Sequence, residues 1–193
     1  METFTNLKPL VDHSSFHEDR RRSIAGLAMN EIDAPIRDIV DAFTKMPCCF
    51  TLQCCWGHFL TDRSQDPHTL EPLAALSRAE TVEYRIAYLA LCIENSDAGR
   101  RLMEDLGRTV FLDPEYIQFG SAWWFWDRQI NSYALQVEPK RHADQDSVTL
   151  PYEEALHVQG VRDLEFAAVR EILRRWRSEE PTSELQSRQS ISY

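Results

Sequence analysis

The chain contains no run of apolar residues long enough to cross a bilayer, which takes roughly 18 consecutive residues. Residues 1–10 also lack the basic flank and the apolar stretch of a secretory signal peptide. These two absences predict a cytoplasmic protein that has no membrane partner.

Glycine is scarce, with 6 residues in 193, and none lies in a phosphate-binding loop or a dinucleotide fingerprint. A nucleotide-type cofactor, if bound, is therefore not expected in a Rossmann crevice. Basic residues are also few, with 21 against 31 acidic ones and a formal net charge of -10. Such a field repels nucleic-acid backbones, which argues against DNA and requires a local basic patch for any RNA or nucleotide partner.

The five cysteines do not fit a disulfide framework, because their number is odd and four of them lie within residues 48–55. We expect all five to be free thiols. Cys48, Cys49 and Cys92 are expected to be small buried hydrophobic side chains, which is the common state of cysteine in a cytosolic core.

Length and pattern predict a single α+β domain over residues 1–176, with a mixed β-sheet covered by helices and a flexible segment at 1–13. The 193 residues stay below the roughly 250 to 300 at which single cores stop growing. Helical and strand-like segments interleave without the regular spacing of βαβ units. The expected helices are 16–29, 35–46, 98–106 and 163–176, and the expected strands are 49–53, 82–90, 116–126, 133–137 and 155–159.

Short polar motifs mark where several of these helices should begin. Ser15 and Glu18 have the spacing of a capping box, and Asp33 precedes Pro35, a residue suited to a first helical turn. One of Asn95, Ser96 and Asp97 is expected to cap the third helix, and Asp163 the last one.

Residues 177–193 form a polar tail that reads as an in-frame translation of a common sequencing-library adapter. The adapter stretch AGATCGGAAGAG encodes the four residues found at 177–180, and its downstream end encodes those at 191–193. The alternative is a natural polar terminus. We expect the segment to be disordered.

Cys55 and His58 belong to the stretch 54–58, which we interpret as the candidate working centre of the protein. Only two residues separate them, and one is Gly57, so a tight turn could bring thiol and imidazole together. In one interpretation the histidine lowers the thiol pKa and creates a thiolate nucleophile or redox thiol. In another the cysteines are buried hydrophobic residues.

A third interpretation of the same stretch is part of a zinc site. Cys54 or Cys55 would act with His58 as ligands, although the cysteines lack the usual CxxC spacing. Such a site would be completed by one of the remaining candidates, His68, His142 or His157.

Two segments resemble the tRNA wybutosine-synthesising N4-methyltransferases, the third enzyme family of that pathway. The hallmark of that family, Thr-Thr-Ser-Ser-Cys-Ser-Gly-Arg at a strand end, overlays residues 51–58, with Cys55 on its cysteine and Gly57 on its glycine. Residues 156–159, Leu-His-Val-Gln, resemble a second family segment, a strand followed by a helix. The resemblance covers about two-thirds of residues 1–176 and is poor over residues 62–153.

The resemblance implies S-adenosylmethionine-dependent methyl transfer to RNA or a nucleotide. It implies that Cys55, His58 and His157 line the reaction pocket. Thr51, Gln53 and Gly57 are the implied cofactor-binding residues, and no resident metal is implied. His58 replaces the arginine of the family motif and is expected to be mostly neutral at pH 7 if unperturbed. The alternative is a non-catalytic ligand-binding, zinc-binding or thiol-based protein on the same scaffold.

Overall fold

The computed structural model describes residues 6–179 except 63, 77–78 and 144. The helices are α1 (Phe16–Ala25), α2 (Arg37–Lys45), α3 (Asp97–Thr109), α4 (Trp123–Trp126) and α5 (Tyr152–Glu179). The strands are β1 (Cys49–Cys55), β2 (His58–Leu60), β3 (Thr81–Arg85), β4 (Ala87–Ile93), β5 (Ile117–Ser121), β6 (Ser132–Val137) and β7 (Ser147–Pro151). Within this part of the chain no helix is long and apolar enough to span a membrane.

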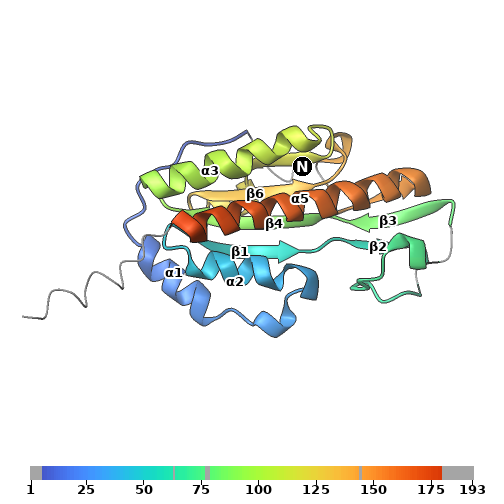
Figure 1. Cartoon of the computed structure of the whole chain (residues 1–193), viewed down its shortest axis with the longest axis horizontal. Helices are drawn as coiled ribbons and strands as arrows, with labels where there is room; N and C mark the ends of the chain where they lie inside the picture. Colours follow the sequence, from blue (N-terminus) through green and yellow to red (C-terminus); the bar gives the residue numbers. More distant parts are fainter. Residues whose placement is uncertain (1–5, 63, 77–78, 144, 180–193) are drawn as a thin grey trace, which may run out of the picture.

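The strands form a four-stranded sheet, in the order β1-β4-β6-β5, and a three-stranded sheet, in the order β2-β3-β7. The two sheets continue one another, because β1 leads into β2 and β3 leads into β4 (Figure 1). All pairings among the described strands are antiparallel. The predicted α+β class is therefore confirmed, whereas the expectation of a mixed sheet was wrong.

Strands β1 and β2 form one arm of a long hairpin, and β3 and β4 form the other arm. The hairpin breaks at Gly57 in the first arm and at Ile86 in the second. The backbone groups freed there have other partners, as buried amides generally require. The Ala87 amide donates to the Tyr84 hydroxyl at 2.9 Å, and the Ile86 amide donates to the Asp146 carbonyl at 3.2 Å. The break is thus a regular part of the fold.

The main core lies between one face of the strands and the helices α2, α3 and α5. Helix α5 crosses the molecule in front of the strands and contacts α2, α3, β3, β6 and β7 (Figure 1). Helix α1 covers the opposite face of β1, where Phe16 packs with Phe50 and Cys92. Because side chains alternate along a strand, Phe50 points away from the core-facing Cys49.

Several element boundaries differ from the sequence prediction. The segment 155–159, expected as a strand, is the second turn of α5, which begins at Tyr152, so Asp163 is internal to this helix and does not cap it. Burial with helical spacing, at Ala155, Val158 and Arg162, continues the pattern of the later turns. The aromatic segment after β5 is helix α4, and α1 ends at Ala25.

Both ends of the described chain are held by specific contacts. The Lys8 amide donates to the Ser121 hydroxyl at 2.7 Å, and Asn131 forms two hydrogen bonds with the backbone of Val11, so these two residues of the segment expected to be flexible have partners in the body of the domain. At the other end α5 continues to Glu179, which pairs with Arg101. The rest of the expected tail, 180–193, lies outside the described residues.

Candidate functional site at the β1–β2 junction

The turn between β1 and β2 is fixed by Gly57. Its φ of 87° is in the region that favours glycine, and a Cβ at this position would lie 2.8 Å from Cβ of Ala87. The Gly57 carbonyl accepts a hydrogen bond from Nη1 of the buried Arg162 at 3.0 Å. The turn is therefore locked between β4 and α5.

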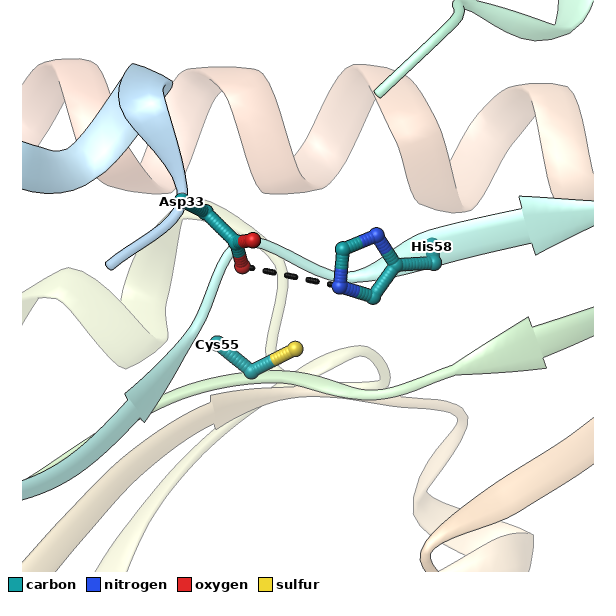
Figure 2. Close-up of side chains that lie close together, drawn as sticks. All are labelled: Asp33, Cys55 and His58. Atoms are coloured by element: carbon teal, nitrogen blue, oxygen red, sulfur yellow. Dashed lines mark ion pairs between the residues drawn. The ribbon is translucent and has the colours of Figure 1, made fainter. Parts of the chain in front are cut away.

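Asp33, Cys55 and His58 converge at this turn (Figure 2). One potential ligand atom from each residue lies within 4.8 Å of the other two. Asp33 reaches the turn from the segment before α2, and its Oδ2 lies 3.5 Å from His58 Nε2. The same oxygen accepts the Trp56 amide at 2.8 Å, so the carboxylate joins the residues on both sides of the turn.

The three side chains differ in exposure. The His58 side chain is 3% exposed and that of Asp33 is 19% exposed, while Cys55 is half-buried. His58 Nδ1 is 3.0 Å from the Thr69 carbonyl, which can only accept, so Nδ1 carries a proton and donates it. This leaves Nε2 directed to Asp33, with Cys55 beside it.

The ion pair defines the charge of the site. The Asp33 carboxylate, with a smaller contribution from Cys55, raises the pKa of His58 to about 10, although burial opposes this shift. Burial alone would raise the pKa of Asp33, but the hydrogen bonds from His58 and the Trp56 amide outweigh it and hold the pKa below its ordinary value. His58 is thus an imidazolium at neutral pH, whereas a neutral side chain was expected.

Arg162 and Trp56 form the wall behind the turn. The Arg162 guanidinium lies 4.2 Å from the centre of the Trp56 ring, which stacks on Phe166 at 4.9 Å. Arg162 also bonds Asp163 through Nε and Nη2. A buried cation therefore fixes the backbone that carries Cys55.

The structure brings together two of the three predicted pocket residues. Cys55 and His58 meet, but the contacts of His157 are to other groups: its Nε2 is 3.0 Å from Asp113 Oδ2, and its ring packs edge-on against Tyr116. His157 lies on α5 and not on a strand. Its predicted part in the site has no support from these contacts.

The predicted cofactor-binding residues do not share one surface. Thr51 is opposite Leu91, but a register shift then places Gln53 opposite Ala90 and Cys55 opposite Tyr88. Directly opposed residues lie on the same face, so Gln53 and Cys55 share a face that Thr51 does not. Gln53 is exposed, whereas Thr51 is buried and its hydroxyl has no hydrogen-bond partner among the described residues.

The zinc hypothesis gains a ligand that the sequence did not suggest. Asp33 joins Cys55 and His58, whereas burial raises the pKa of Cys54 to about 12. His68 is exposed, with its ring 5.6 Å from that of His58, and His142 lies in a separate short helix after β6. All five cysteines are free, and Cys48, Cys49 and Cys92 are buried, as predicted.

Asp33 and Arg162 are the two site residues that sequence reasoning missed. Asp33 was interpreted only as a helix start, and its contact with Trp56 spans 23 residues that no local pattern connects. Arg162 did carry a signal, because it follows Val158 and precedes Phe166 on the buried face of α5. A cation at such a position needs partners, and Arg162 has them in the Asp163 carboxylate and the Gly57 carbonyl.

Comparisons with known proteins give one solved structure that supports the fold, and they are silent on activity. No protein-family model matches the chain, and neither does any curated protein. The chain is similar to the structure of the PH1069 protein from Pyrococcus horikoshii, with a TM-score of 0.52 and 9% identity over 83% of this chain and 96% of that one. It also matches a hypothetical protein from Aeropyrum pernix, with a TM-score of 0.40 and 12% identity over 74% of this chain and 98% of the other.

Proposed function

We propose that the β1–β2 junction binds S-adenosylmethionine and a nitrogen-containing RNA or nucleotide substrate for methyl transfer. The observation that supports this most is the convergence of Asp33, Cys55 and His58 at the turn whose sequence resembles the hallmark of the wybutosine methyltransferases. The Gly57 shared with that hallmark is demanded here by its positive φ and by the closeness of Ala87. The resemblance thus falls on residues with a geometric role.

The residues at the junction suit such ligands in part. When bound, S-adenosylmethionine supplies an electrophilic methyl group carried by a positively charged sulfur. Asp33, paired with the His58 imidazolium, offers a carboxylate that can accept hydrogen bonds, and Gln53 offers an exposed amide on the same face as Cys55. Thr51 does not fit, because it is buried on the other face.

The protein's own groups would orient the accepting nitrogen. The Asp33 carboxylate can accept a hydrogen bond from a substrate N–H and so direct the nitrogen lone pair away from itself. The anchored turn keeps Cys55 in place beside it, since Arg162 holds the Gly57 carbonyl. Orientation of reacting groups by a rigid frame is a large source of rate enhancement.

Calorimetry with S-adenosylmethionine on the full chain tests the proposal. Even millimolar affinity corresponds to about 4 kcal/mol and gives measurable heat at high ligand concentration. We expect binding that Gln53→Ala weakens, and we expect Cys54→Ala, on the opposite face of β1, to leave it unchanged.

A transfer assay then separates binding from chemistry. The methyl-labelled cofactor is incubated with the protein and bulk tRNA, and incorporation is compared between the wild type and Asp33→Asn. The absence of both heat and incorporation for the folded wild-type protein would refute the methyl-transfer proposal.

A further inference from the structure

The Asp33, Cys55 and His58 donor atoms form a set that is known from metal sites and that a plain ion pair does not require. Thiolate sulfur, imidazole nitrogen and carboxylate oxygen are the three side-chain donors that Zn²⁺ takes in proteins. Here one atom of each kind lies within 4.8 Å of the others. We propose that these three side chains bind a divalent metal ion of the zinc class, with a fourth position open to water or a substrate atom.

The spacing of the donors is close to what such an ion requires. Zinc bonds of about 2.0 to 2.3 Å at tetrahedral angles place neighbouring ligand atoms about 3.3 to 3.6 Å apart. The distance from His58 Nε2 to Asp33 Oδ2 is 3.5 Å. The Cys55 sulfur, on a half-buried side chain at the end of β1, points toward His58 (Figure 2) and already lies within 4.8 Å of both of these atoms.

The groups around the donors already hold them as outer partners do in metal sites. His58 donates its Nδ1 proton to the Thr69 carbonyl, which fixes the tautomer that presents Nε2 to an ion. Asp33 Oδ2 accepts the Trp56 amide, which orients the carboxylate. The contacts with Thr69 and Trp56 do not involve the other two donors. Both would remain if a metal ion replaced the proton that lies between His58 Nε2 and Asp33 Oδ2.

Charge and softness select the kind of ion. A carboxylate and a thiolate together neutralise a dication, and the imidazole adds no charge. A ligand set with sulfur and nitrogen favours zinc over magnesium or calcium, which prefer oxygen ligands throughout. Three protein ligands with one open position is the arrangement of catalytic rather than structural zinc sites.

Cobalt(II) titration of the reduced full-length protein tests the site, because tetrahedral cobalt bound to a thiolate shows sulfur-to-metal charge-transfer absorption. We expect one equivalent of cobalt to give this band and zinc to abolish it by displacement. Cys55→Ser should lose the band, whereas Cys54→Ser, the adjacent thiol on the other face, should keep it. Asp33→Asn should weaken zinc binding at least about tenfold.

The outcomes decide the matter even if one variant folds poorly. Loss of the band in a folded His58→Gln protein supports the site as well as loss in Cys55→Ser. No band in the wild type, or a band that survives Cys55→Ser, would overturn the proposal. The proposal does not rest on methyl transfer: chelator-treated protein that still binds S-adenosylmethionine, or metal-loaded protein that does not, separates the two.

Discussion

The long hairpin has one half in the four-stranded sheet and the other half in the three-stranded sheet. The two sheets differ in how their strands are buried, and the candidate site lies at the boundary between them. In the four-stranded half, β6 is buried at every position and β4 at all but one. In the three-stranded half, β7 alternates exposed and buried residues along its whole length. The centre of the four-stranded sheet is thus covered on both faces, whereas β3 and β7 are covered on one. His58 is the first residue of β2, which joins these two regions and is itself buried.

The largest expected effect comes from Gly57→Ala, which disturbs the boundary itself. A side chain at a φ of 87° is strained, and its Cβ would lie 2.8 Å from that of Ala87. Strain and overpacking together should destabilise the protein by roughly 2 to 4 kcal/mol. Urea denaturation followed by circular dichroism measures the difference.

Gly160 provides the matched control, since it is exposed in the interior of α5 and a Cβ there would meet nothing within 4 Å. Gly160→Ala should stabilise the protein by roughly 0.5 to 1 kcal/mol, because alanine loses less backbone entropy in a helix. Equal effects of the two substitutions would mean that the boundary is not locked as described.

A second large effect concerns the doubly covered half, where α3 and α5 enclose Glu165. This side chain is 1% exposed and hydrogen-bonds the Thr109 hydroxyl at 2.7 Å. Burial raises its pKa to about 7 from an ordinary value of 4.5, with the Thr109 hydrogen bond opposing. As the pH rises, the Glu165 carboxyl therefore loses its proton at a lower pH in the unfolded chain than in the folded protein. The contribution of this bound proton to the free energy of unfolding is complete below about pH 4.5 and is lost as the pH rises to about 7.

Glu165→Gln removes this dependence because its amide does not titrate. We expect the free energy of unfolding of wild type relative to Glu165→Gln to fall by up to about 3 kcal/mol between about pH 5 and pH 8. Denaturant titrations of both proteins at the two pH values give the comparison. A constant difference would show that Glu165 is ionised in the folded protein at both values.

The same contrast explains how far the sequence could be interpreted. Strands β1 and β6 and helix α3 were predictable, because their apolar periodicity and the Ser96 cap are local signals; the Ser96 hydroxyl does accept the Gly99 amide, at 3.1 Å. Strand β2 was missed because three residues after a glycine turn carry too short a pattern. The start of α5 was misplaced because Leu-His-Val-Gln was compared with a strand, whereas its burial follows helical spacing.

The residues of the candidate site likewise fall into those that the sequence could predict and those that it could not. The meeting of Cys55 and His58 follows from their spacing around Gly57, so it was predictable. The position of Asp33 depends on how α2 packs on β1, and that of His157 depends on the length of α5. The first is a property of tertiary packing, which local patterns do not encode, whereas the second follows from a helical pattern that was interpreted as a strand.

The smallest expected effects compare two cysteines, one from each environment. Cys92 is fully buried beside Phe16 and Phe50, and its thiol donates to the Ile130 carbonyl at 3.4 Å. Removing this sulfur by Cys92→Ala leaves a small cavity and should cost about 1 to 2 kcal/mol.

Cys55 is half-buried at the junction, where its sulfur accepts the Gly57 amide at 3.4 Å and also interacts with the His58 ring. Cys55→Ala should therefore change stability by no more than about 0.5 kcal/mol, while it removes the cobalt charge-transfer band and weakens cofactor binding. Two melting curves and one ligand titration suffice for the comparison. If Cys55→Ala melts well below wild type and Cys92→Ala does not, then Cys55 is a packing residue. The polar cluster at the β1–β2 junction would then serve stability rather than ligand binding.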